Sequence, residues 1–392
     1  MQRLLSLILL LCATSYSIMG QEVADSIVPA VSDSVDVKLP FYRKGIIGKV
    51  VHYFDETNKP KKAKKFDMSF IGGPYYSSDT KFGIGLVAAG LYRADTTDTI
   101  TPVSDVSLYA KATTSMMFTL GLSGNHILKH DRSRFVYDVN FSSIKTYFWG
   151  IGYDKDVDDA NKSSYRYLNS QIRASYVWKL APNFYLGPLV SFDYINGSKF
   201  QKPELWEGED ARTFNFGAGF TAQFDSRDFL TNAHKGLYAR LDQRFNPKFL
   251  FNRYAFSLTE LTFNAYHQVW KGGVLAYNLH ARLTYGNTPW GLLSTLGGTS
   301  VMRGYFEGRY RDKSEIDVCI ELRQHVWRRN GVVLWVGGAT VFPKFSEISA
   351  RKLLPNYGIG YRWEFKKRVN VRLDLGFGRH QTGFIFSINE AF

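Results

Sequence analysis

The sequence predicts an all-β fold, namely a transmembrane antiparallel β-barrel of about 16 strands, and three observations support this prediction. The chain begins with an export signal. No later stretch has the roughly 18 consecutive apolar residues of a membrane-spanning helix, although aromatic residues make up 16% of the chain, with 24 Tyr and 30 Phe. Many segments alternate between apolar and polar side chains, as strands with one lipid-facing side do.

The first 20 residues have the pattern of a secretory signal peptide. A short basic start precedes the apolar run 4–13, and small polar residues continue to Gly20. We expect cleavage close to Gly20, which removes Cys12 and leaves Cys319 as the single cysteine of the mature chain. No intrachain disulfide is then expected.

Residues 21–65 are predicted to form a periplasmic linker without a folded domain of its own. The stretch 21–38 is acidic and rich in Ser, Val and Asp, and 44–56 has apolar residues at the spacing of a short amphipathic helix. Five lysines follow within 59–65. They are interpreted as a solvated run, or alternatively as a contact with lipid headgroups or a partner.

The barrel is expected to occupy residues 66–392, where period-two alternation identifies the strands. In 369–377 the Val and Leu residues share one face, whereas Arg372 and Asp374 share the other. In 316–323 the apolar residues oppose Asp317, Glu321 and Arg323. A soluble sandwich also alternates, but it rarely carries so many long charged side chains on one face. One face is therefore expected to meet lipid and the other a wet lumen.

An even number of strands suits closure of such a barrel, because both chain ends then lie on the same side of the membrane. Turn signals separate several strands, and the pattern is weakest where the third and fourth strands meet, at 113–115. The predicted strands lie near 67–76, 81–93, 103–112, 115–127, 133–146, 165–179, 183–195, 211–225, 235–245, 254–270, 273–286, 315–328, 331–343, 356–365, 368–378 and 382–391.

The sequence does not indicate an enzyme or a nucleic-acid-binding protein. The formal charge is +14, but export and the lack of a nucleic-acid motif favour a basic pore lining. The nearest match to a GxSxG elbow, at 121–125, departs from it at Asn125. No HExxH or CxxC motif occurs. We therefore expect no catalytic residues, no metal site and no cofactor.

A long glycine-rich and basic segment, 297–313, follows the eleventh predicted strand, and we call it the tongue. Its centre, Met302-Arg303-Gly304-Tyr305, resembles the VRGY/F loop of the bacterial surface antigen family, the barrel superfamily of BamA and TamA. The segments 224–242 and 72–86 and the last two strands resemble the same family. The resemblance covers roughly residues 66–392 and implies a short form without POTRA domains.

This resemblance implies an anchor that holds the tongue inside the barrel. In the family, the loop arginine pairs with acids on strands twelve and thirteen. Glu321 stands at the first of these positions, but Gly337 stands at the second, so a weaker anchor or a substitute such as Asp317 or Asp374 is expected. The predicted anchor residues are Arg303, Gly304, Tyr305 and Glu321. The alternative is a surface loop with Arg303 exposed.

The first and last strands are expected to meet at a weak seam. Gly72, Gly73 and Pro74 weaken the first strand, because glycine packs poorly and proline lacks a donor N–H. The last strand is expected to place its apolar residues, up to Phe392, on its lipid side, and a terminal Phe resembles the signal that recruits barrels for insertion. The alternative for Gly72–Pro74 is a bulge near the barrel rim.

The function that the resemblance implies is assembly, insertion or export of proteins at the bacterial outer membrane through this seam. The expected partners are outer-membrane lipids, with client outer-membrane proteins or periplasmic and lipoprotein partners as candidates, and no nucleic acid. Two other classes stay open: a small-solute pore plugged by the tongue, and a structural barrel within a larger complex.

Overall fold

The computed structural model describes residues 66–92, 101, 104–230, 232–366 and 368–392. The signal peptide predicted for 1–20 and the linker predicted for 21–65 lie outside these residues. No helix in the described part of the chain is long and apolar enough to cross a membrane.

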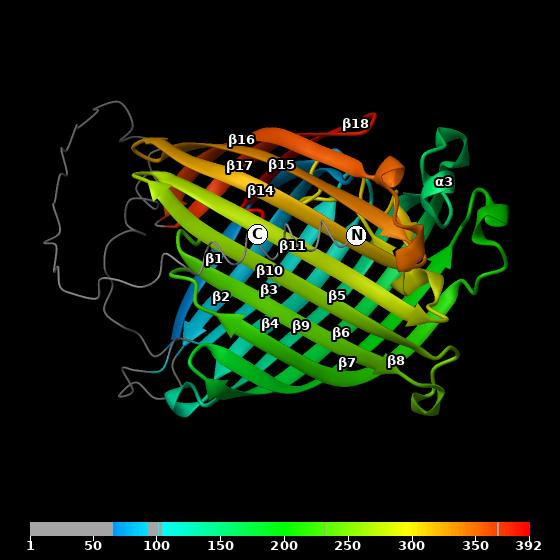
Figure 1. Cartoon of the computed structure of the whole chain (residues 1–392), viewed down its shortest axis with the longest axis horizontal. Helices are drawn as coiled ribbons and strands as arrows, with labels where there is room; N and C mark the ends of the chain where they lie inside the picture. The colour runs from blue at the N-terminus through cyan, green and yellow to red at the C-terminus, as the bar shows by residue number, and fades with distance from the viewer. Residues whose placement is uncertain (1–65, 93–100, 102–103, 231, 367) are drawn as a thin grey trace, which may run out of the picture. The chain divides into compact units, whose positions relative to one another are not determined.

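Within these residues, sixteen antiparallel strands close into a barrel (Figure 1). Neighbours in sequence are neighbours in the wall, except that β11 pairs with β14 across the tongue and β1 closes on β18. The strands are β1 (Phe66–Ser77), β2 (Lys81–Tyr92), β3 (Ser104–Thr113), β4 (Phe118–Ile127), β5 (Ser133–Phe148), β6 (Ser163–Ala181), β7 (Phe184–Ser198), β8 (Arg212–Asp225), β9 (Gly236–Asn246), β10 (Phe256–Trp270), β11 (Gly273–Gly286), β14 (Ser314–Trp327), β15 (Asn330–Phe342), β16 (Leu354–Lys366), β17 (Val369–Gly378) and β18 (Gln381–Ile388).

The predicted all-β barrel of 16 strands is confirmed, and each predicted strand has an observed counterpart. Several strand ends differ by up to three residues: β4 begins at Phe118, not at 115, and β18 stops at Ile388, not at 391. Asn389 adopts a left-handed backbone with φ of 70°. Its N–H donates to the carbonyl oxygen of Asn370 at 2.7 Å, and the chain leaves the barrel wall there.

The polarity of the wall is the reverse of that in a soluble protein. Large apolar side chains such as Ile84, Leu86 and Val336 are about 60% exposed on the outer face, whereas Glu321 and Asp374 are fully buried on the inner face. This confirms the alternation expected from the sequence, because only a lipid environment makes such an outer surface favourable.

The two ends of the barrel differ in their connections. At one end, two-residue turns join β6 to β7, β10 to β11 and β14 to β15. The other end, at the right of Figure 1, carries the longer loops, and we call it the loop-rich end. Short helical turns lie in the connections: η2 (Lys129–Asp131), α3 (Tyr153–Asp156), η3 (Asp159–Asn161), η4 (Pro203–Trp206), η5 (Lys248–Leu250), η6 (Trp290–Leu292), η7 (Phe345–Glu347) and η8 (Ala350–Lys352). Bacterial barrels direct their longer loops to the cell exterior.

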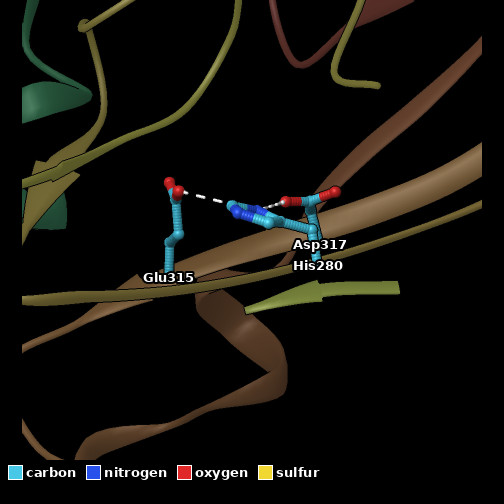
Figure 2. A group of neighbouring side chains, drawn as sticks. All are labelled: His280, Glu315 and Asp317. Atoms are coloured by element: carbon cyan, nitrogen blue, oxygen red, sulfur yellow. Dashed lines mark hydrogen bonds and ion pairs between the residues drawn. The ribbon is translucent and has the colours of Figure 1, made fainter. Parts of the chain in front are cut away.

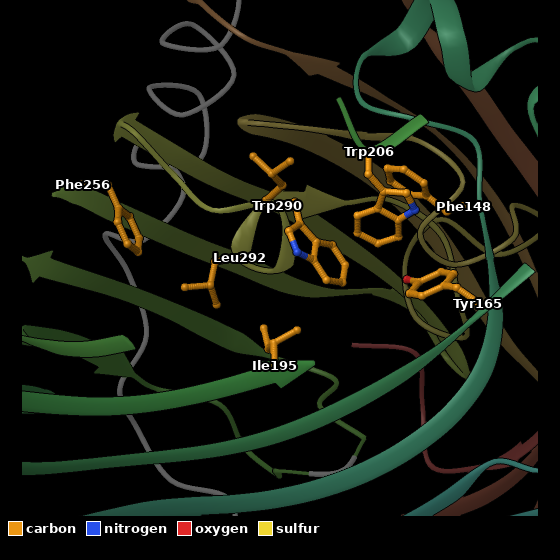
Figure 3. Close-up of a cluster of buried hydrophobic side chains, with 8 residues drawn as sticks. Phe148, Tyr165, Ile195, Trp206, Phe256, Trp290 and Leu292 are labelled. Carbon is orange, nitrogen blue, oxygen red and sulfur yellow. The ribbon is translucent and has the colours of Figure 1, made fainter. Parts of the chain in front are cut away.

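A buried aromatic cluster at the loop-rich end holds the segment just before the tongue (Figure 3). Trp290, on η6, packs edge to face on Trp206 of η4, with ring centroids 4.2 Å apart. Its indole N–H donates to the carbonyl oxygen of Asp210 at 2.6 Å. The cluster consists of Phe148, Tyr165, Ile195, Trp206, Phe256, Trp290, Leu292 and Leu293. It thereby joins the approach to the tongue to strands β5, β6, β7 and β10.

Candidate functional site: the tongue and the seam

The tongue folds as a hairpin between β11 and β14. Two short strands pair at its base: β12 (Ser294–Thr295), just before the tongue, and β13 (Arg311–Asp312), near its end. The returning side is tied to α3: the Arg309 side chain donates to the Asp156 carbonyl at 2.9 Å, and the Arg311 N–H donates to the Asp156 carboxylate at 2.8 Å. The base of the tongue is therefore held by backbone pairing and by a neighbouring loop.

The arginine at the centre of the tongue is completely buried. Its Nη2 lies 2.5 Å from Oε2 of Glu321 on β14, and its Nη1 lies 2.9 Å from Oδ2 of Asp374 on β17. The guanidinium also stacks on Trp335 of β15, 3.7 Å from the ring centroid. Arg303 thus clamps three strands, and the alternative of an exposed arginine does not describe this geometry.

The second acid of the clamp is Asp374, one of the two substitutes expected from the sequence. Asp317, the other candidate, lies instead beside His280, 2.8 Å from its Nδ1. A Cβ atom at Gly337 would come within 2.3 Å of the Val318 carbonyl oxygen. An aspartate therefore does not fit at Gly337 without a shift of the backbone.

Further arginines surround the two acids of the clamp. Arg323 Nε lies 2.7 Å from Glu321. Arg362 and Arg372 lie 2.5 and 3.3 Å from the Asp374 carboxylate. These side chains all come from the inner face of β14, β16 and β17, so both acids of the clamp have partners besides Arg303. The pairing could not be read from the sequence, although the alternation placed these arginines on the polar face.

Gly304 and Tyr305 seat the tongue against the last strands. Gly304 has a φ of 111°, and a Cβ atom there would lie 2.7 Å from the backbone of Gly376, so a side chain does not fit. The Tyr305 hydroxyl donates to the Pro355 carbonyl oxygen at 2.6 Å and accepts the Arg379 N–H at 2.7 Å. The tongue therefore lies on β16 and β17, close to the seam.

The seam between β1 and β18 is short. Its register contains two residue pairs, Tyr76 with Phe386 and Ser77 with Ile385. Beyond them, the Ser78 N–H donates to the Phe384 carbonyl at 3.2 Å. By contrast, β1 pairs with β2 along its entire length, and β18 pairs with β17 along its entire length.

The predicted seam residues of β1 lie outside this short register. Gly72, Gly73 and Pro74 pair with Leu86, Gly85 and Ile84 of β2. In the described register, pairing of β1 with β18 starts only at Tyr76, on the loop-rich side of Pro74.

Phe392 is not at the seam, and the expectation that it continues the lipid-facing row of β18 is wrong. Its ring packs near Cys319, Val333 and Trp335 inside the barrel. Arg323 donates to its carbonyl oxygen at 2.9 Å. The cause lies two residues earlier, where Glu390 forms a buried ion pair with Arg362 at 2.8 Å and draws the chain inward.

A contact between the tongue and the first hairpin crosses the seam. The Glu307 N–H donates to Oδ2 of Asp79, in the turn between β1 and β2, at 2.8 Å. Burial raises the pKa of Asp79 to about 6, although the hydrogen bond from Glu307 opposes this shift. Burial also raises the pKa of the Glu307 carboxyl group.

This contact predicts a stability that depends on pH. The folded pKa of Asp79, about 6, exceeds the unfolded value of about 3.9. The folded state therefore holds more protons between these values, and stability falls as the pH rises through this window. We expect the thermal midpoint of the wild type, relative to Asp79→Asn, to be higher at pH 4.5 than at pH 7.5. An identical pH response of the two proteins would contradict this assignment.

The comparisons agree with this architecture. Residues 105–379 match the family model described as the Omp85 superfamily domain. No curated protein sequence matches the chain.

Among solved structures, BamA from Haemophilus ducreyi lacking POTRA domains 1–3 is similar, with a TM-score of 0.56 and 10% identity over 84% of this chain and 71% of that one. CdiB from Acinetobacter baumannii is also similar, with a TM-score of 0.55 and 12% identity over 84% of this chain and 60% of that one. CdiB from Escherichia coli is similar with a TM-score of 0.55 and 9% identity over 84% of this chain and 64% of that one. The chain thus spans less than two thirds of either CdiB.

The family model covers most of the barrel, and the likeness to the solved structures extends over the same fold. The apolar outer face gives the physical reason for a place in the outer membrane. The chain is an outer-membrane β-barrel that belongs to the Omp85 superfamily.

Proposed function

We propose that this barrel assists the insertion or export of proteins at the outer membrane by parting β1 from β18. The short seam carries the proposal. Two residue pairs join these strands, whereas the neighbouring ladders extend along entire strands. Each lost ladder hydrogen bond costs roughly 0.5–1.5 kcal/mol, so a short ladder is the least costly place to open the wall.

The tongue holds the β18 side of the seam by more bonds than the β1 side. It is bonded to β14, β16 and β17 through Arg303 and Tyr305, and the Phe306 N–H donates to the Gln381 side chain of β18 at 3.0 Å. On the other side, the contact between Glu307 and Asp79 reaches only the turn that follows β1. In this proposal β18 is the fixed edge and β1 is the edge that moves.

Family membership supports the same class of function, since Omp85 barrels insert or transport proteins in general. In this class no residue of the chain acts on a substrate chemically, and the candidate partners are outer-membrane lipids together with client proteins or partner lipoproteins.

A polar cavity favours the second candidate function, a plugged small-solute pore. The cavity has a volume of about 260 Å³ and is lined by residues of β5, β6, β7, β9 and β10, including Asp138, Arg173, Arg240, Asp242 and Glu260. Charged walls of both signs suit water and small polar solutes. In this reading the buried aromatic cluster at the loop-rich end would form part of the plug.

Depletion of the protein from the cells that produce it, followed by outer-membrane proteomics, tests the proposal. We expect a selective loss of certain barrels or surface lipoproteins, restored by a plasmid copy of the wild type. An unchanged protein profile, together with altered uptake of small solutes, would favour the pore.

A further inference from the structure

A histidine and two acids meet on the inner face of β11 and β14, away from the Arg303 clamp (Figure 2). His280 lies opposite Asp317 in the strand register, and Glu315 lies opposite Arg282. The imidazole Nδ1 is 2.8 Å from Oδ2 of Asp317 and 3.8 Å from Oε1 of Glu315. One ligand atom from each residue falls within 4.8 Å of the other two.

The two acids of this group are buried and only partly hydrogen-bonded. Glu315 is 4% exposed and Asp317 is 5% exposed, and among the described residues their ion pairs are both to His280. Each also has a buried oxygen without a hydrogen-bond partner, Oε2 of Glu315 and Oδ1 of Asp317. The Glu315 carboxyl group faces the imidazole (Figure 2). Buried carboxylates require paired charges or a metal, and in the described part of the chain the same imidazole is the ion-pair partner of both acids.

We propose that His280, Glu315 and Asp317 bind one divalent transition-metal ion of the zinc class. Zinc takes imidazole nitrogen and carboxylate oxygen in tetrahedral sites, whereas calcium and magnesium take oxygen ligands. Tetrahedral ligands about 2.1 Å from zinc lie roughly 3.4 Å from one another. The observed spacings of 2.8 and 3.8 Å bracket that value. Three protein ligands leave the fourth position to water.

The far side of the imidazole has the support that such a site requires. Its Nε2 faces Oε1 of Glu260 at 3.7 Å, and Glu260 is held by Arg244 at 2.9 Å and by Arg282 at 3.5 Å. A carboxylate behind a metal-binding histidine fixes the ring and raises its basicity. Glu260 also lines the polar cavity of about 260 Å³.

The site has a structural consequence that does not depend on the proposed function. The chain enters the tongue from β11 and leaves it into β14, and Glu315 is the second residue of β14. A metal held by His280, Glu315 and Asp317 would join these two strands at the base of the tongue. Zinc is therefore expected to stabilise this part of the wall.

The experiment uses the folded full chain in detergent, stripped of metal with EDTA and titrated with zinc chloride by calorimetry, with magnesium as the comparison ion. Cobalt(II) serves as a spectroscopic probe, because a tetrahedral site gives intense visible bands and an octahedral site gives weak ones. The variants are His280→Gln and Asp317→Asn. His267→Gln, an exposed histidine of β10, is the matched control, and heat-dependent gel mobility reports folding.

We expect one zinc per chain, a tetrahedral cobalt spectrum and a higher thermal midpoint with zinc, but no effect of magnesium. His280→Gln and Asp317→Asn should weaken zinc binding by at least about 100-fold, whereas His267→Gln leaves it unchanged. Glu260→Gln should weaken it by about 10–100-fold, as for other residues that support a metal ligand.

Three results would overturn the proposal. The first is that the wild type binds no zinc, in which case the group is an ion-paired histidine only. The second is that zinc binding persists in folded His280→Gln and Asp317→Asn. The third is that cobalt gives an octahedral spectrum in the wild type. This last result would rule out the tetrahedral site even if both variants fail to fold.

Discussion

Arg303→Ala should release the tongue from the wall and make it a substrate for proteases. The guanidinium is fully buried and bonds Glu321 and Asp374 at once. Removal of one member of a buried ion pair typically costs about 3–5 kcal/mol, because the remaining charge loses its partner. Since Arg323, Arg362 and Arg372 still contact the two acids, we expect about 3 kcal/mol, the lower end of this range.

Limited proteolysis with chymotrypsin measures this release. The enzyme cleaves after aromatic residues, and Tyr305, Phe306 and Tyr310 within the tongue are present in every variant. Cleavage in the tongue should be rapid in Arg303→Ala and slow in the wild type, and the thermal midpoint should fall in the variant.

Two further variants test whether the loss of the specific contacts of Arg303, or merely the loss of a positive charge, releases the tongue. Arg303→Lys keeps the charge but loses the two-pronged geometry and the stacking on Trp335, so we expect cleavage at an intermediate rate. Lys313→Ala is the matched control, because this cation at the base of the tongue makes one 3.3 Å hydrogen bond, to the Gly286 carbonyl oxygen. A tongue in Arg303→Ala that resists chymotrypsin as the wild type does would show that the ion pairs do not hold it.

Most of the barrel could be predicted from the sequence because lipid and water impose a simple alternation on every strand. The faces of 316–323 and 369–377 were assigned correctly for this reason, and burial of Glu321 and Asp374 follows from it. The short pair β12 and β13 was not predicted, because two-residue strands carry no periodic pattern.

The partners of the inward-facing charges could not be predicted in the same way. Asp317 and Asp374 both lie on the polar face of their strands. Which of them pairs with Arg303 depends on how deep the tongue reaches into the barrel and on the register of β14 to β17. The inward turn at Phe392 depends on the ion pair between Glu390 and Arg362, which joins β16 to the segment after β18. The group around His280 was missed for the same reason, since its members come from two strands and form no local motif.

A disulfide that joins β1 to β18 should abolish the proposed insertion or export of proteins if that function requires the seam to open. Tyr76 and Phe386 are opposite one another in the register. Opposed residues of antiparallel strands have Cα atoms about 4.5–5.5 Å apart, within the range of about 4.4–6.8 Å that a disulfide accepts. The substitutions Tyr76→Cys and Phe386→Cys are made together with Cys319→Ala, which removes the buried free thiol.

The matched control places the disulfide between strands that are already joined along their length. Leu373 of β17 lies opposite Phe386 of β18, so Leu373→Cys with Phe386→Cys, again with Cys319→Ala, shares one engineered cysteine with the locked seam. This control shows whether an engineered disulfide on the lipid-facing side of the barrel wall disturbs the protein by itself.

The decisive measurement is the outer-membrane protein profile of depleted cells that carry either locked barrel, with and without a reducing agent. We expect the β17–β18 control to restore the profile under both conditions. The barrel locked between β1 and β18 should restore it only after reduction. If the barrel with an intact disulfide across the seam restores the profile as well as the control does, the wall does not part at β1 and β18, and the proposed mechanism is wrong.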